Sequence, residues 1–135
     1  MFGPLTRAQV REVDRITIEQ FHMPGLLLME HAAIALRDAC REMLRGSLNH
    51  RTVAIVCGGG NNGGDGYALG RLLLNAGADV RLFETKSTEQ LTGDAAINAK
   101  IYHALDVGTF EATPSAIQSA RCDLIVDALL GTGLT

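Results

Sequence analysis

The sequence predicts an α/β fold, a Rossmann-like three-layer α/β/α arrangement with a mostly parallel sheet and two leading N-terminal helices. Short, continuous apolar runs such as TVAIVC and LIVDALL alternate with segments whose apolar residues recur at helical spacing. This alternation indicates βαβ units, in which parallel strands are covered on both faces. A glycine-rich turn, CGGGNNGGDG, joins one of these strands to the next helix. The 135 residues suit one domain rather than two.

Two helices are expected before the first strand. Thr6 and Gln9 have the spacing of a capping box, so the first helix should run from there to about Phe21. Pro24 suits the first turn of the second helix, and Gly46 is a plausible end for it. These helices form a cover outside the βαβ repeat.

The rest of the chain predicts four strands with helices between them. The strands are TVAIVC (52–57), DVRLFE (79–84), DVGTFE (106–111) and CDLIVDALL (122–130). The helix after the glycine-rich turn should end at Gly77. A later helix has Ile97, Ile101 and Leu105 in phase, and Thr113 opens a short helix that continues to about 120.

Composition excludes several classes of function. The net charge of −3 gives no electrostatic basis for binding nucleic acid, which requires a basic face. The longest apolar stretch, GLLLM, is too short to span a membrane, and the first residues do not resemble a signal peptide. The 3 cysteines form no CxxC pair, which argues against a zinc site and favours free thiols. We therefore expect a cytoplasmic location.

The glycine-rich turn has the pattern of a nucleotide-binding loop. Gly58, Gly60 and Gly63 satisfy GxGxxG between a strand and a helix, and Glu84 ends the next strand, where an acid that binds ribose is expected. The first hypothesis is an ordinary dinucleotide site, and the alternative is a tight turn without a ligand. Lys86, in the loop that follows, is a weaker candidate for contact with phosphate.

Other residues of the turn fit a simple phosphate cradle less well. Asn61 and Asn62 bring amides that both donate and accept, and Asp65 is expected in the first turn of the helix. At an effective dielectric constant of about 20, a phosphate roughly 4 Å from that carboxylate would be repelled by roughly 4 kcal/mol. Either Asp65 binds hydroxyl groups instead, or a cation nearby offsets the charge.

Asp127 interrupts the last apolar strand near its carboxyl end. It could cap a neighbouring turn, but a buried charge also needs a donor, a cation or a ligand. Gly131 and Gly133 follow it in a second flexible loop. Ligands of open α/β sheets bind beyond the carboxyl ends of the strands, so the two loops should face each other across one crevice.

These motifs resemble the YjeF N-terminal domain family, the NAD(P)H-hydrate epimerases. GGGNNGGDG and DLIVDALLGTGL carry the resemblance, and LTRAQVREVDR, MPGLLLMEHAA and LTGDAAIN also fit. The resemblance covers the whole chain (1–135) and implies that the family's domain continues past Thr135. Glycine stands at Gly59, where the family usually has proline.

The resemblance implies epimerisation of hydrated NADH or NADPH, NAD(P)HX, which is substrate rather than cofactor. A partner dehydratase then restores the normal dinucleotide, and the family is often dimeric. The implied substrate contacts are Asn61, Asn62, Gly63, Gly64, Asp65, Gly131, Thr132, Gly133, Leu134 and Thr135. Asn62 and Asp127 match the family's potassium ligands, and Asp127 is the expected catalytic acid/base, a role suited to a carboxylate that titrates near neutral pH.

Two other functions stay open. One is a non-catalytic scaffold of the same fold that binds a nucleotide or a partner. The other is an ordinary NAD-dependent dehydrogenase, which Glu84 favours but which would need a separate substrate domain.

Overall fold

A computed structural model describes residues 3–131 and confirms the predicted α/β class. A parallel, four-stranded sheet has the order β3-β2-β1-β4. The strands are β1 (Thr52–Cys57), β2 (Asp79–Glu84), β3 (Thr109–Glu111) and β4 (Leu124–Ala128). The helices are α1 (Arg7–Glu19), α2 (Gly25–Met43), α3 (Asn61–Asn75), α4 (Gly93–His103) and α5 (Pro114–Ser119), with a 3₁₀ turn η1 (Thr88–Gln90). No helix within 3–131 has the length and apolar character needed to cross a membrane.

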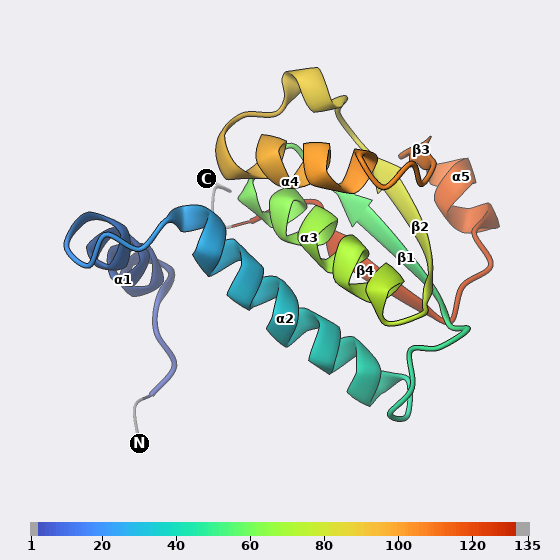
Figure 1. Ribbon diagram of the computed structural model, residues 1–135, viewed down its shortest axis with the longest axis horizontal. Coiled ribbons are helices and arrows are strands. Elements are labelled where there is room, and N and C mark those ends of the chain that lie inside the picture. Colours follow the sequence, from blue (N-terminus) through green and yellow to red (C-terminus); the bar gives the residue numbers. More distant parts are fainter. Residues whose placement is uncertain (1–2, 132–135) are drawn as a thin grey trace.

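Helices cover both faces of the sheet (Figure 1). α3 and α4 pack on one face, and α2 lies against α3 as an outer layer. The main core lies under α3, where Ile55, Leu69 and Leu82 are fully buried. A smaller cluster around Val56 and Phe83 packs against the α5 side. Each βαβ unit therefore places its strand ends, and the loops that follow them, at one edge of the sheet.

The predicted apolar side of α4 is wrong. Ile97, Ile101 and Leu105 are 43%, 39% and 43% exposed. The helix instead buries Ala95, Asn98, Ala99 and Tyr102. The reason is close packing against α3, since a Cβ atom on Gly64 would lie 2.9 Å from the Cα atom of Ala95, and one on Gly70 would lie 2.9 Å from the Tyr102 ring. Small residues and Tyr102, rather than the isoleucines, define this interface.

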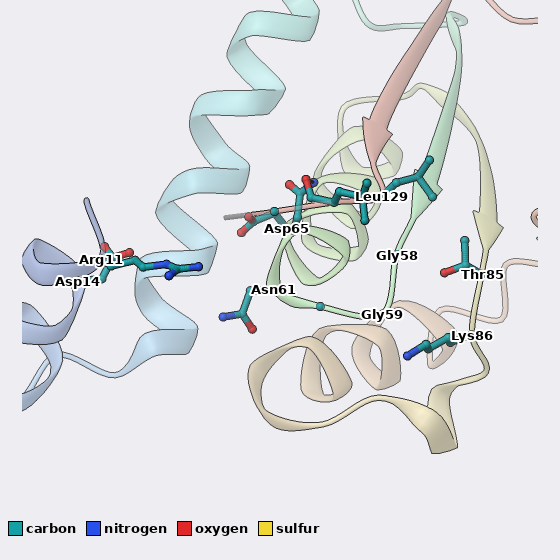
Figure 2. Close-up of a pocket in the computed structure, with 13 residues that line it drawn as sticks. Arg11, Asp14, Gly58, Gly59, Asn61, Asp65, Thr85, Lys86 and Leu129 are labelled. Atoms are coloured by element: carbon teal, nitrogen blue, oxygen red, sulfur yellow. Dashed lines mark hydrogen bonds between the residues drawn. The ribbon is translucent and has the colours of Figure 1, made fainter. Parts of the chain in front are cut away.

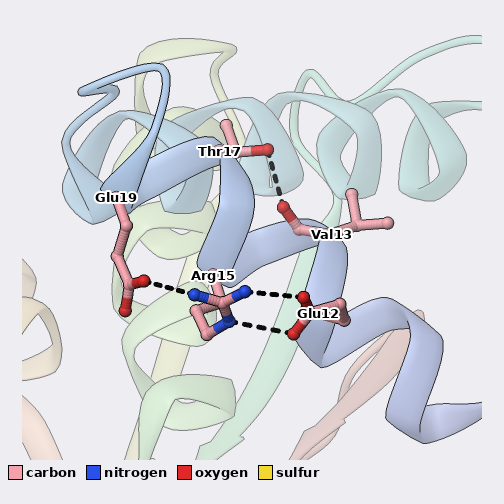
Figure 3. A network of polar contacts seen from close by, with 5 residues as sticks. All are labelled: Glu12, Val13, Arg15, Thr17 and Glu19. Atoms are coloured by element: carbon pink, nitrogen blue, oxygen red, sulfur yellow. Dashed lines mark hydrogen bonds and ion pairs between the residues drawn. The ribbon is translucent and has the colours of Figure 1, made fainter.

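α1 is the least embedded element. Its capping box forms as predicted, with Thr6 and Gln9 bonded reciprocally, but α1 contains no buried residue. Polar contacts hold the helix from within (Figure 3): Arg15 pairs with Glu12 at 2.6 Å and with Glu19, and the Thr17 hydroxyl donates to the Val13 carbonyl at 2.7 Å. Because such contacts are local, they support a helix without fixing it to the sheet.

α3 begins earlier than predicted. Gly60 is its N-cap, so Asn61 and Asn62 lie in the first turn and Asp65 in the second. The glycines of the turn do not have positive φ; within 3–131 such glycines are Gly46, Gly77 and Gly93. At Gly58 and Gly63 glycine is required by close packing and not by left-handed backbone.

Candidate functional site

The principal cavity of about 1120 Å³ lies at the carboxyl edge of the sheet. Three segments line it: the glycine-rich turn and start of α3, the residues after β2, and the residues after β4 (Figure 2). Two side chains of α1, Arg11 and Asp14, complete it. This is the position that open α/β sheets use for ligands, as the sequence predicts.

The start of α3 gives one wall of the cavity backbone N–H donors that take no part in the helix's own hydrogen bonds. The first backbone hydrogen bond of the helix runs from the Gly64 N–H to the Gly60 carbonyl at 3.1 Å. The N–H groups of Asn61, Asn62 and Gly63 precede it, and such groups, with the helix dipole, favour an anion. Asn61 and Asn62 line the cavity beside them.

Packing holds the glycine-rich turn against the loop after β4. The Gly58 N–H donates to the Ala128 carbonyl at 2.9 Å, and a Cβ atom on Gly58 would lie 1.9 Å from the Leu129 carbonyl oxygen. A Cβ atom on Gly63 would lie 1.9 Å from the Gly58 oxygen. Both positions require glycine because the obstructing atoms belong to the backbone.

Asn62 joins the two predicted loops directly. Its side-chain Nδ2 donates to the Leu130 carbonyl at 2.8 Å. The next residue, Gly131, lies close enough that its Cβ atom would be 3.3 Å from the Asn62 Cβ. The asparagine turn and the β4 loop thus form adjoining walls of one cavity. The other predicted contacts of that loop, Thr132, Gly133, Leu134 and Thr135, lie outside the described residues.

Asp65 is the carboxylate whose titration the fold alters most at this cavity. Its half-buried side chain lines the cavity near Asp14 of α1 (Figure 2). Burial first, and then the charge of Asp14, raise the pKa of Asp65 to about 6. A carboxyl group with such a pKa exchanges protons readily near neutral pH.

Asp127 is exposed, whereas the sequence predicted a buried charge at this position. Its carboxylate is exposed and accepts a hydrogen bond from the Leu129 N–H at 2.9 Å. Leu124, Val126 and Ala128 alternate with it toward the α3 core, so Asp127 shares the opposite sheet face with the 53% exposed Ile125. Among residues 3–131, Asp127 is not part of the cavity lining. Its catalytic and potassium roles stay predictions.

Glu84 does not have the geometry of a ribose-binding acid. One of its carboxylate oxygens, Oε1, accepts from the Tyr67 hydroxyl at 2.7 Å and lies 2.8 Å from His103 Nε2. The other, Oε2, accepts from the Thr109 hydroxyl at 2.8 Å. These partners hold Glu84 away from the principal cavity, which Thr85 and Lys86 line in its place. Glu84 therefore no longer supports the alternative of an NAD-dependent dehydrogenase.

Comparison with known proteins identifies the family. The family model described as YjeF-related protein N-terminus matches residues 25–135. The chain belongs to this family.

Named relatives of this YjeF-family chain are longer than it is. It is 40% identical to the NAD(P)H-hydrate epimerase of Rhodopirellula baltica over 133 residues, which cover 96% of this chain and 52% of that protein. It is 34% identical to the bifunctional NAD(P)H-hydrate repair enzyme Nnr of Moorella thermoacetica, again over 96% of this chain but 26% of that protein. The chain thus spans about half of one relative and a quarter of the other.

A solved structure shows the same fold. The crystal structure of yeast ynu0 aligns with a TM-score of 0.81 at 23% identity, and the alignment covers 99% of this chain and 59% of that one. The arrangement predicted from the sequence is therefore shared with that structure.

Sequence reasoning missed the contribution of α1 to this YjeF-family cavity. Arg11 and Asp14 line it, together with Thr85, Leu129 and Leu130. The loop residues could have been found from their positions after strand ends. No signal in the sequence assigned a role to Arg11 or Asp14, since their place at the cavity depends on where α1 lies in the folded chain.

Of the two predicted potassium ligands, Asn62 lines the cavity and Asp127 does not. Because Asn62 Nδ2 donates to Leu130, the Asn62 carbonyl oxygen is the atom of that amide suited to a cation. Amide, carboxylate and backbone carbonyl oxygens are hard ligands for such ions. Within residues 3–131 no cluster of three or more histidine, cysteine or acidic side chains has the geometry of a metal centre, so the donors of a cation here would be mixed.

Proposed function

We propose that the protein carrying this chain epimerises hydrated NADH or NADPH. The observation that carries the proposal is the hydrogen bond from Asn62 to Leu130, which joins the asparagine turn to the β4 loop. Both segments line one large cavity. The chain is 40% identical to a protein named NAD(P)H-hydrate epimerase across nearly all of its length. The cavity offers N–H groups that can bind an anion, polar amides and a carboxylate of raised pKa. These groups fit a dinucleotide with anionic phosphates, whose hydrated nicotinamide carbon is epimerised with the help of proton transfer.

Different residues of this chain bind the substrate, hold the cation and transfer the proton. The N–H groups that open α3 bind a phosphate of the substrate, and Asn61 and Asn62 orient it. A potassium ion held through Asn62 and Asp127 would offset the negative charge of phosphate and Asp65. The raised pKa of Asp65 allows it to take up and return a proton, while Asp127 keeps the acid/base role that the family resemblance implies.

The product passes to a dehydratase. The Moorella relative is named as a bifunctional repair enzyme, which supports a partnership with a second repair activity. We further propose a cytoplasmic location, where the dinucleotide pools lie, and a homodimer.

Exchange between the two epimers of NADPHX, followed by chromatography, tests the proposal. The full-length protein should accelerate the exchange in the presence of potassium. Asp127→Ala and Asp65→Asn should each be assayed against Asp106→Asn, a substitution at an exposed position after α4. Loss of at least about 100-fold in one of the two variants identifies the acid/base group, since general acid/base catalysis contributes factors of this size.

A wild-type protein that leaves the epimer ratio at its spontaneous rate would refute epimerase activity. Stabilisation by NADP⁺-like ligands in a thermal-shift titration, without any exchange, would instead favour the scaffold function. Equal stabilisation in sodium and in potassium would remove the potassium site from the proposal.

A further inference from the structure

Lys86 lies over the glycine-rich turn. An ideal Cβ atom at Gly59 would be 2.6 Å from Lys86 Cδ, 2.9 Å from Cε and 3.1 Å from Nζ. The lysine side chain therefore runs along the Gly59 peptide and brings its ammonium group to the cavity, across the turn from Asn61 (Figure 2). Lysine is flexible, but this position keeps its charge at the cavity wall.

Charged side chains lie at both ends of the cavity. Arg11, Asp14 and Asp65 lie toward the α1 end, and Lys86 lies at the opposite end, after β2 (Figure 2). The ion pairs found among residues 3–131 do not include Lys86. Its charge is thus available to an anionic group of a ligand.

The position after β2 has a defined meaning in dinucleotide-binding folds. The ribose 2′ position lies there, where an acid binds a free hydroxyl group and a cation accommodates a 2′-phosphate. In this chain the acid, Glu84, is held by Tyr67, His103 and Thr109. The Thr85 hydroxyl donates to the Cys57 carbonyl at 3.1 Å, so the cavity side offers the Lys86 ammonium instead.

We propose that Lys86 binds the 2′-phosphate of a phosphorylated dinucleotide and gives the site a preference for the NADPH-derived substrate over the NADH-derived one. This inference rests on the proposed function, since it assumes that a dinucleotide lies with its pyrophosphate at the start of α3. It names a specificity-determining residue and leaves the chemical step unchanged.

Gly59 makes this placement of Lys86 possible. Any side chain at position 59 would meet the outer carbons of the lysine, and a lysine side chain can move aside at little cost. Gly59→Ala should therefore displace Lys86 from the turn without unfolding the protein. This gives a second route to the same loss, through a different residue.

Isothermal titration of the full-length protein with ADP-ribose and 2′-phospho-ADP-ribose tests the inference. Lys86→Ala should weaken binding of the 2′-phosphorylated ligand roughly tenfold, the effect of losing one charge-assisted hydrogen bond, and leave ADP-ribose binding within about twofold. Lys100→Ala is the matched control, because Lys100 is exposed on α4 and lines a separate cavity of about 490 Å³. It should change neither affinity.

A double-mutant cycle links the two residues. In the protein that keeps Lys86, Gly59→Ala should reduce the preference for 2′-phospho-ADP-ribose over ADP-ribose as Lys86→Ala does. In the Lys86→Ala protein it should add little, because the two changes remove the same interaction. An equal loss for both ligands in Lys86→Ala would place the lysine on the pyrophosphate and overturn the inference, as would unchanged binding of both.

The assay also separates this inference from the proposed function. Wild-type exchange of NADPHX epimers with unaltered discrimination in Lys86→Ala refutes the role of Lys86 and leaves the epimerase intact. Absence of binding of either ligand to the wild type refutes the role of Lys86, whereas only epimer exchange at its spontaneous rate refutes the epimerase.

Discussion

The cavity has one wall fixed by close packing and one wall held loosely. In the glycine-rich turn, Gly58 and Gly63 touch backbone atoms so closely that no side chain fits. α1, which supplies Arg11 and Asp14, contains no buried residue and is supported by its own ion pairs. The comparison teaches that the backbone geometry of the glycine-rich turn is built into the core, whereas the pKa of Asp65 depends on its burial and, to a smaller extent, on a peripheral helix.

The largest expected effect is at the fixed wall. Gly63→Ala places a methyl group 1.9 Å from the Gly58 carbonyl oxygen, so we expect a loss of about 3 kcal/mol in the free energy of unfolding, as for severe overpacking. Urea denaturation measures it. Gly60→Ala is the control, since a Cβ atom there meets nothing within 4 Å and φ is −110°. Similar stability of the two variants would contradict a packing origin for the glycines.

The second prediction concerns the contact between the two walls. The pKa of Asp65 is raised from 3.8 to about 6, so the folded state holds its proton more tightly than the unfolded state does. The charged carboxylate therefore lowers stability as pH rises from about 4 to 6 and above. Asp65→Asn should raise the melting temperature at pH 8 and leave it unchanged near pH 4.

Asp14→Asn tests how much of that effect comes from α1. Removing the Asp14 charge should lower the Asp65 pKa by the smaller part of its shift, because burial is the larger cause. NMR titration of the Asp65 carboxyl carbon measures this. An unchanged pKa would show that α1 does not lie against the cavity in solution.

The smallest expected effect is at the loose wall itself. Thr6→Ala removes the N-cap of α1, a change that costs a helix about 1 kcal/mol. Because α1 buries no residue, we expect faster amide exchange within 7–19 and little change in global unfolding. A large, concentration-dependent loss of stability would instead indicate that α1 supports a homodimer.

Sequence reasoning succeeded where one local rule decided the outcome. The apolar runs 52–57 and 79–84 became strands with the predicted limits, and the Thr6 capping box formed. It failed where packing between elements decided. Ile97 and Ile101 predicted the wrong face of α4 because the α3 glycines pack against Ala95 and Tyr102.

The same division holds at the candidate site. GGGNNGGDG and the β4 loop were predicted to meet, and the hydrogen bond from Asn62 to Leu130 joins them. Burial and the charge of Asp14 raise the pKa of Asp65 to about 6, a shift that depends on neighbours in space. Asp127 lies exposed on the last strand, where the Leu129 N–H binds it, and Glu84 is held by three partners distant in sequence.

The sequence by itself determined the order of the strands and helices along the chain, because periodicity and glycine placement act through local geometry. It also determined that the sheet is parallel and that two loops lie at its carboxyl edge. Only the tertiary structure decided which charges face the cavity. Arg11 and Asp14 reach it from a helix far away along the chain, Lys86 reaches it because Gly59 leaves room, and Glu84 is turned away. Charge and pKa depend on neighbours in space, and those neighbours are brought together only when the helices pack.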